Sequence, residues 1–203
     1  MAALTFFYGK AFNRGRRDSI STNFKNLTLG VLEQYQTLRD IDLGSLDAQL
    51  WSAGVNNRHD RRMVYESIGF VRDDLQEYSG NIFNWAVASI LSGRSAEAYT
   101  VLTSVHAIGD KLATFYLRDV TLLEGIEDRI GTEDYGYFQP VDTRVERVAG
   151  SLEIIDEVDR GRTWTIKNKI IRACVDADVS PLLFNAGSWL VGAHAYTLLL
   201  ERL

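Results

Sequence analysis

The sequence predicts an all-α protein, and three observations support this. Apolar residues recur at helical spacing through nearly the whole chain, as in Leu46, Leu50 and Trp51. Alternating strand patterns are scarce, and residues 4–8 are the one weak strand candidate. The chain of 203 residues is 46% hydrophobic, which is enough for one sizeable core or for two small lobes sharing a cleft. We therefore predict a single helical domain over residues 1–203, built as one body or as two lobes around a cleft.

Apolar periodicity and capping residues delimit the individual helices. Ser45 is a plausible N-cap and Gly54 a plausible stop for the helix between them. The predicted helices cover 29–38, 46–53, 63–78, 79–91, 95–103, 112–123, 142–152, 163–177 and 181–203, the last with a break near Gly192. Residues 124–139 fit no helix, since they combine glycines with many acidic residues. A segment of this length without regular structure is usually functional or mobile.

Composition excludes several classes of protein. No stretch approaches the roughly 18 apolar residues that a membrane span needs. The apolar N-terminus precedes its basic residues Lys10, Arg14, Arg16 and Arg17, which is the reverse of a signal peptide. The single cysteine, Cys174, excludes an intramolecular disulfide and a four-cysteine iron–sulfur cluster. We therefore expect an intracellular monomer of the cytoplasm or nucleoid, with no membrane partner, no cofactor and no metal.

Charge is unevenly distributed along the chain. The formal net charge of −5 argues mildly against nonspecific affinity for nucleic acid, which depends on neutralising phosphates. However, Arg58, Arg61 and Arg62 cluster around His59, and residues 160–172 are basic without an acid. Residues 119–134 are strongly acidic. The pattern leaves room for a basic face on an acidic protein.

The segment VHAIGDK at 105–111 predicts a tight hairpin between two helices, over residues of about 95–123. Gly109 is expected to supply a turn conformation that other residues tolerate poorly. Unpaired backbone N–H groups at such a turn can bind a DNA phosphate without a basic side chain. The candidate DNA-binding residues are His106, Ala107, Ile108, Gly109, Asp110 and, further along the chain, Arg144. An ordinary helical hairpin is the alternative.

Two side chains could carry chemistry at helix N-termini. Lys111 falls in the first turn of the helix after the hairpin, where it is either a solvated lysine or a nucleophilic amine. Asp142, 31 positions later, begins the next helix within the segment 139–150. It is either a plain N-cap or a carboxylate that stabilises developing positive charge, and the two roles are compatible.

These segments resemble the helix–hairpin–helix DNA glycosylase superfamily, which includes endonuclease III and the 8-oxoguanine glycosylases. The usual hairpin pattern in that superfamily is Leu-Pro-Gly-aliphatic-Gly-x-Lys-x-Ala. The matching residues are Ile108, Gly109, Lys111 and Ala113. The chain departs from the pattern at Val105-His106 and at Ala107, where the first glycine belongs. The segment PVDTRVERV at 140–148 resembles the superfamily's Pro-Val-Asp-Thr-x-Val-x-Arg-Val.

The resemblance implies roles for both residues. The matching lysine attacks the sugar C1′, expels the base and forms a Schiff base that leads to strand cleavage. This chemistry requires a neutral amine, which the neighbouring acid Asp110 would oppose. The aspartate matching Asp142 stabilises the oxocarbenium-like sugar and assists proton transfer. The long spacing between Lys111 and Asp142 resembles the archaeal branch of the 8-oxoguanine glycosylases.

The C-terminal segment supplies candidates for a base pocket. Residues 181–189 resemble the Pro-x-x-Phe-Asn-x-x-x-Trp of closing helices in several such proteins. Asn185 and Trp189 are one helical turn apart and share a face, as a sandwich for a flipped base requires. The predicted pocket residues are Phe138, Gln139, Pro140, Asn185 and Trp189. A core tryptophan with a structural asparagine, and aromatic loop residues packed in the core, are the alternatives.

The leading hypothesis is a base-excision repair glycosylase with abasic-site lyase activity. It would remove a damaged base, with 8-oxoguanine the best guess, from double-stranded DNA that contains the lesion or an abasic site. One alternative is a noncatalytic DNA-binding or scaffold protein that kept the fold. The other is a glycosylase for a different damaged base.

Overall fold

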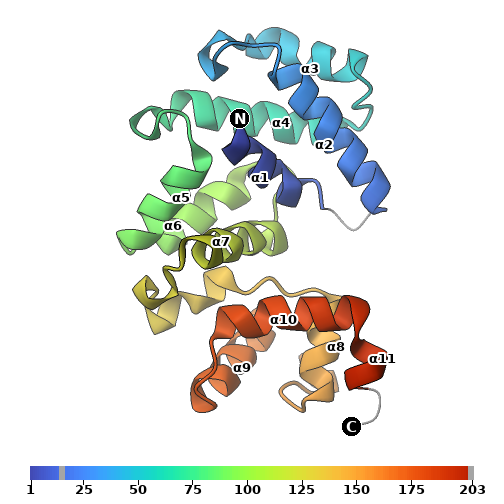
Figure 1. The fold of residues 1–203 in the computed structure, drawn as a ribbon, viewed down its shortest axis with the longest axis vertical. Helices are drawn as coiled ribbons and strands as arrows, with labels where there is room; N and C mark the ends of the chain where they lie inside the picture. The colour runs from blue at the N-terminus through green and yellow to red at the C-terminus, as the bar shows by residue number, and fades with distance from the viewer. Residues whose placement is uncertain (14–16, 201–203) are drawn as a thin grey trace.

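The computed structural model describes residues 1–13 and 17–200, and every regular element in this part of the chain is helical (Figure 1). The prediction of an all-α protein is confirmed. The α-helices are α1 (Ala2–Ala11), α2 (Asp18–Leu32), α3 (Leu43–Ser52), α4 (Arg58–Asp73), α5 (Ile82–Leu91), α6 (Ser95–Ser104), α7 (Asp110–Glu124), α8 (Thr143–Ser151), α9 (Thr163–Asp176), α10 (Pro181–His194) and α11 (Tyr196–Leu199). Short 3-10 turns are η1 (Leu38–Asp40), η2 (Gln76–Tyr78), η3 (Glu127–Arg129), η4 (Thr132–Phe138) and η5 (Glu157–Asp159). In the described ranges, we find no helix with the length and apolar character to cross a membrane.

The N-terminal segment is a helix rather than the weak strand that its sequence suggested. In α1, the buried side chains are Leu4, Phe7, Tyr8 and Ala11, which follow a helical period. The Tyr8 hydroxyl lies 2.8 Å from that of Ser67, which ties α1 to α4. The basic residues at 14 and 16 lie outside the described residues, as do the last three residues of the predicted 181–203 helix.

Several helix ends differ from the predicted ones. The predicted 29–38 helix is the end of α2, which stops at Leu32, followed by η1. The helix predicted from residue 63 starts at Arg58, because the Asn57 side chain caps it by accepting a hydrogen bond from the Asp60 amide. The acidic segment 124–139 forms two 3-10 turns, and it buries Phe138 completely.

The expected break in the C-terminal segment falls at Ala195, three residues after Gly192, where α10 ends at His194 and α11 begins at Tyr196. A Cβ atom on Gly192 would lie 2.9 Å from Cβ of Arg144 and 3.1 Å from its backbone oxygen. The glycine therefore permits a close crossing of α10 over the first turn of α8. This crossing, rather than a helix break, explains the residue.

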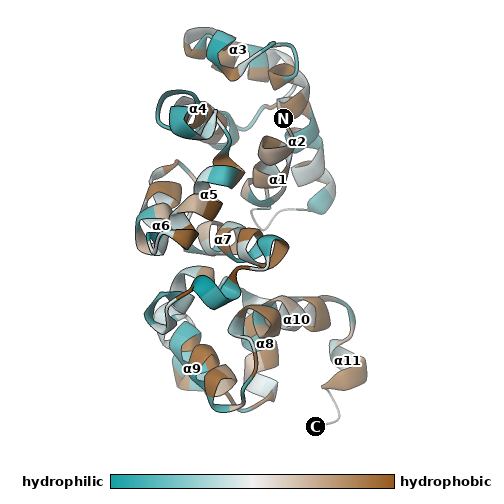
Figure 2. Cartoon of the chain, turned by 60° about the vertical axis from the view of Figure 1, so that its left-hand side comes forward, coloured by the Kyte–Doolittle hydropathy of each residue, from teal (hydrophilic) through white to brown (hydrophobic). Residues whose placement is uncertain are grey.

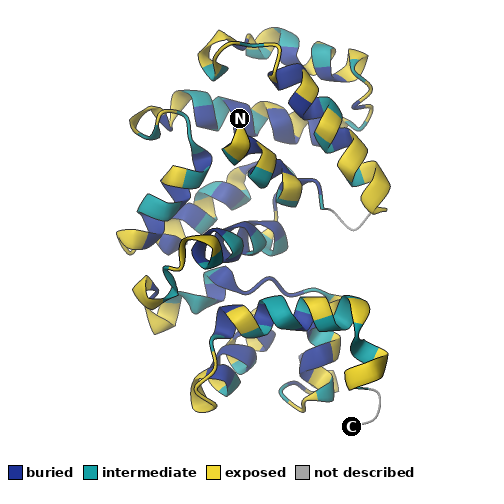
Figure 3. Ribbon diagram, viewed as in Figure 1, coloured by how far each residue is buried: buried dark blue, intermediate teal, exposed yellow. Residues whose placement is uncertain are grey.

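Two clusters of buried side chains divide the molecule. The larger one joins α1 to α7 with η4, and we call these elements the N-terminal lobe. The smaller one lies among α8, α9 and α10, the C-terminal lobe, with Val145, Ile166 and Ile170 at its centre. In Figure 1, α10 lies across the molecule between α7 and the α8–α9 pair. In Figure 3, the buried residues of α7 and of these C-terminal helices, coloured dark blue, lie on the sides that face neighbouring helices.

Candidate active site

A hairpin joins α6 to α7 as the sequence predicted, and its turn is held by local hydrogen bonds. The Ile108 amide donates to the Val105 carbonyl oxygen at 3.0 Å, and both of these side chains are buried. The left-handed position of the turn is Ala107, with φ of 65°. Gly109 has φ of −97° and ψ of −175°, an extended conformation open to any residue. The expectation for Gly109 is thus wrong, and Ala107 adopts a conformation that costs an L-residue about 1–2 kcal/mol.

The hairpin presents unpaired amides to solvent. Within the described residues, the backbone N–H groups of Ala107, Gly109, Asp110 and Lys111 have no hydrogen-bond acceptor. A Cβ atom on Gly109 would have nothing within 4 Å, so the space beside Gly109 is open. Two other hairpin amides are occupied: that of Ile108 by the Val105 carbonyl, and that of His106 by Glu66. Clustered free amides at a helix start form an anion-binding site.

Lys111 and Asp142 line the same cavity. Lys111 is the second residue of α7 and is partly exposed. Asp142 is the N-cap of α8, where its Oδ1 accepts hydrogen bonds from the amides of Arg144 at 3.0 Å and Val145 at 3.1 Å. Its Oδ2 receives no hydrogen bond from the described residues. The carboxylate is therefore fixed through one oxygen while the other is open to a ligand.

The cavity lies between α7 and α10 and has a volume of about 680 Å³, and we call it the α7–α10 cleft. Ligand pockets of small molecules usually fall between about 300 and 1,000 Å³. The lining residues with relevant chemistry are Lys111, Phe115, Arg118, Asp142, Arg144 and Trp189. They come from segments that are far apart in the chain, so the fold assembles this cleft only when the two lobes meet.

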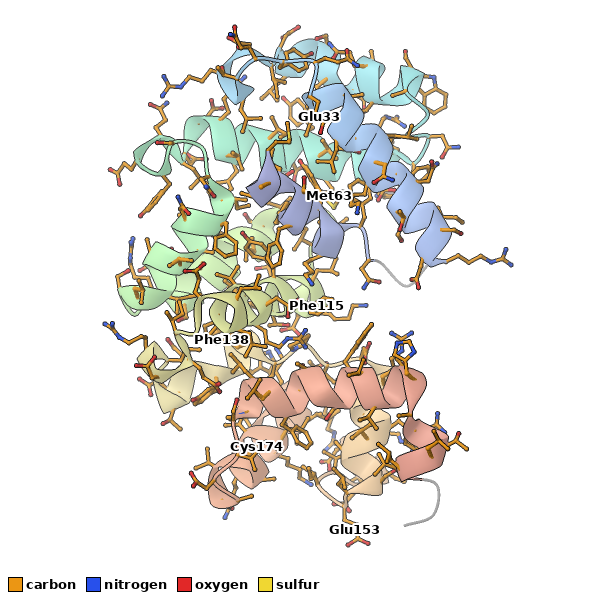
Figure 4. The ribbon with its side chains drawn as sticks, viewed as in Figure 1. Glu33, Met63, Phe115, Phe138, Glu153 and Cys174 are labelled. Atoms are coloured by element: carbon orange, nitrogen blue, oxygen red, sulfur yellow. The ribbon has the colours of Figure 1, made fainter. Side chains whose placement is uncertain are left out.

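Aromatic side chains stand on both sides of the cleft. Trp189 belongs to α10, and the Arg144 guanidinium lies 4.9 Å from its ring centroid. Phe115 lies on α7, one turn after Lys111, at the gap between α7 and α10 in Figure 4. Sequence reasoning missed Phe115, although its position four residues after the lysine placed it on the same helix face.

A chain of hydrogen bonds supports the floor of the cleft. The buried Arg118 donates to Asn185 Oδ1 at 2.8 Å, and Asn185 Nδ2 donates to the Pro140 carbonyl oxygen at 3.1 Å. Arg118 also contacts Asp119 through two nitrogens, at 2.8 and 2.6 Å. The network fixes the backbone just before Asp142 and links α7 to α10.

The remaining predicted pocket residues occupy different places. Pro140 lines the cleft. Asn185 is buried in the network below it, which is the structural role that the sequence left open as an alternative. Phe138 is fully buried in the core of the N-terminal lobe. Gln139 is also fully buried, and neither polar atom of its side-chain amide has a hydrogen-bond partner among the described residues.

The carboxylate of Asp110 is paired away from the hairpin amides. Lys167 Nζ, on α9, lies 2.5 Å from Asp110 Oδ1, and the Tyr99 hydroxyl donates to the same oxygen at 3.0 Å. Burial lowers the pKa of the Lys167 ammonium, and the Asp110 hydrogen bond opposes part of that effect. Burial and the Asp110 charge raise the pKa of Tyr99 to about 12, so the phenol remains a donor. The acid beside Lys111 is therefore compensated by a cation, which the sequence did not reveal.

Comparisons of the chain with models of protein families, with curated proteins and with solved structures gave no match. The described residues contain no group of three or more side chains suited to hold a metal ion.

Proposed function

We propose that the protein is a DNA glycosylase with abasic-site lyase activity. The observation that carries the proposal is the convergence of Lys111 and Asp142 on one aromatic-walled cleft, beside a hairpin with four free amides. The hairpin would hold a phosphate of the duplex, which fixes the register of the DNA without reading its sequence. The nucleotide would be flipped into the cleft, because its glycosidic bond is out of reach inside the duplex.

Each side chain then has a defined task. Nζ of Lys111 forms a bond to C1′ as the bond from C1′ to the base nitrogen breaks, and the base leaves with that electron pair and takes up a proton. Asp142 stabilises the positive charge on the sugar and accepts the proton that Nζ loses. The bond from C1′ to the ring oxygen O4′ then breaks, O4′ takes the electron pair and a proton, and an iminium forms between C1′ and Nζ. Loss of a proton from C2′ then expels the 3′ phosphate and cuts the strand.

The base itself would lie in the cleft beside Phe115 and Trp189, next to the Arg118 and Arg144 guanidinium groups that lie 4.6 and 4.9 Å from their ring centroids. The choice of 8-oxoguanine rests on the resemblance of the long Lys111–Asp142 spacing to the archaeal 8-oxoguanine glycosylases. A pocket for another damaged base is an outcome of the same experiment, since the substrates below are tested in parallel.

The test is borohydride trapping, which reduces the iminium to a stable protein–DNA adduct. Duplexes with 8-oxoguanine, uracil, an alkylated purine or an abasic site are incubated with wild type, Lys111→Ala and the control Lys169→Ala. Lys169 is a lysine of α9 that pairs with Asp159 at 2.6 Å, outside the cleft. We expect trapping by wild type and by the control but not by Lys111→Ala. Failure of wild type to trap on every substrate, or full trapping by Lys111→Ala, would remove the lyase assignment.

A noncatalytic duplex-binding protein is the second candidate. It is favoured by the N-cap role of Asp142, which alone accounts for that residue in the fold. Tight binding of the duplexes without base release or trapping would select it.

A further inference from the structure

The first turn of α4 lies against the hairpin, although 47 positions separate their contacting residues. Nδ1 of His59 and Nε2 of His106 are 2.8 Å apart, and the two rings are nearly parallel. Glu66, further along α4, accepts the His106 amide at 2.6 Å. Burial alone would raise the pKa of Glu66, but hydrogen bonds from Arg62 and from this amide hold it below its ordinary value. The start of α4 therefore lies against the hairpin at His106, the residue before the first free amide.

Three arginines of this turn have different surroundings. Arg61 is buried, and it donates hydrogen bonds to Asp47 at 2.8 Å and to the Val55 carbonyl oxygen at 3.1 Å. Its role is therefore structural. Arg58 is exposed and has no ion pair among the described residues. Arg62 is 62% exposed and contacts Glu66 through Nε at 2.7 Å. Its two terminal nitrogens have no acceptor within the described part of the chain.

We propose that Arg58 and Arg62 bind the phosphodiester backbone of the duplex whose neighbouring phosphate the hairpin holds. The inference rests on the proposed function and extends the DNA interface from the hairpin onto α4. A guanidinium group suits a phosphate because it can donate two parallel hydrogen bonds. Charges follow one another at about 3.4 Å along each strand axis of B-DNA, so a strand held at the hairpin brings further phosphates past the adjacent helix.

The charge balance of the protein makes such contacts necessary. With a net charge of −5, the chain as a whole repels DNA, so affinity must come from local cations and amides. Figure 2 shows that α4 is coloured largely as hydrophilic, which distinguishes it from the apolar α5 beside it. The two arginines are the cations of this turn that the fold leaves available.

The experiment measures binding of a labelled duplex with a tetrahydrofuran abasic analogue, which cannot be cleaved. The dissociation constant is followed by fluorescence anisotropy as a function of salt for wild type, Arg58→Gln, Arg62→Gln and the double variant. Each lost phosphate contact should reduce the slope of log Kd against log salt by about 0.9. For each lost contact, the ratio of the variant Kd to the wild-type Kd should therefore be about eight times larger at 0.1 M salt than at 1 M salt.

Matched controls remove the same charge elsewhere. Arg39 is exposed in η1 without an ion pair in the described residues, and it matches Arg58. Arg172 is 85% exposed and pairs with the residue four positions later, as Arg62 does. We expect Arg39→Gln and Arg172→Gln to keep the wild-type slope. Slopes for the Arg58 and Arg62 variants that equal those of these controls would overturn the inference.

A further variant separates charge from hairpin support. Glu66→Gln keeps an acceptor for the His106 amide and frees Arg62, so its slope should equal or exceed that of wild type. If Glu66→Gln loses as much slope as Arg62→Gln, the arginine acts through the hairpin and the inference is wrong. Absence of duplex binding by wild type would instead defeat the proposed function, on which the inference depends.

Discussion

Replacing Gly109 by alanine should separate folding from DNA binding at the hairpin. Its φ and ψ are those of extended backbone, and a Cβ atom there would have nothing within 4 Å. The substitution therefore strains nothing, and we expect the free energy of unfolding to change by less than about 0.5 kcal/mol. The new methyl group, however, would occupy the open space beside the Gly109 amide, where we expect the phosphate to bind.

The loss in binding follows from the hydrogen bond to the phosphate that the methyl group would obstruct. A hydrogen bond to a charged group contributes about 1.5–3 kcal/mol. Loss of one such bond to a phosphate should raise the Kd for the tetrahydrofuran duplex by a factor of about 10 to 150. Anisotropy gives the Kd, and urea unfolding followed by circular dichroism gives the stability.

Ala107→Gly is the companion variant, because it changes the other special position of the turn. Relief of the left-handed alanine is worth about 1–2 kcal/mol, and the added backbone freedom of glycine costs about 0.5–1 kcal/mol. We expect Ala107→Gly to stabilise the protein by up to about 1 kcal/mol and to keep the wild-type Kd. Wild-type binding by Gly109→Ala, or equal destabilisation by both variants, would refute this account of the hairpin.

Three other predictions concern the supports of the site. Lys167→Met leaves the Asp110 carboxylate without its cation, so the free energy of unfolding in urea should fall by about 1–3 kcal/mol. Adding Asp110→Asn to this variant should restore much of that stability. If the losses of the two single variants simply add in the double variant, the pairing is contradicted. Because the pKa of Glu66 is held low, its bond to the His106 amide is present above the ordinary glutamate pKa and is lost as pH falls through the lowered value. Hydrogen exchange at the His106 amide should accelerate below about pH 4.3. If exchange at this amide changes with pH only as the intrinsic exchange rate does, the hydrogen bond to Glu66 does not protect it. Gly192→Ala should push α10 away from α8 and cost about 1–3 kcal/mol; unchanged stability and trapping would show that the crossing adapts.

The helical class and the main site residues were accessible to sequence reasoning for definite physical reasons. Long apolar stretches with a helical period leave few other folds, and a cap such as Asp142 acts through neighbouring amides. Lys111 and Asp142 were predicted at helix starts, and the fold places both of them at one cleft.

The features that escaped prediction depend on distant partners or on ambiguous local patterns. Asp110 pairs with a lysine 57 positions away, and no local pattern reports this. Glycine is compatible with most backbone conformations, so Gly109 in the sequence could not show that Ala107 is the left-handed residue. The short apolar run in α1 fits a strand as well as a helix, and only the positions of its buried side chains distinguish them.

The bonds from Lys167 to Asp110 and from Arg118 to Asn185 have a kinetic consequence. Each connects α7 to a helix of the C-terminal lobe, and Arg118 itself lines the cleft. A cleft braced in this way is already formed before the substrate arrives, and opening it would separate buried charged groups. We therefore expect the rate of productive association to follow the ease with which a nucleotide leaves the DNA stack, and to be faster opposite a mismatch than in a fully paired duplex.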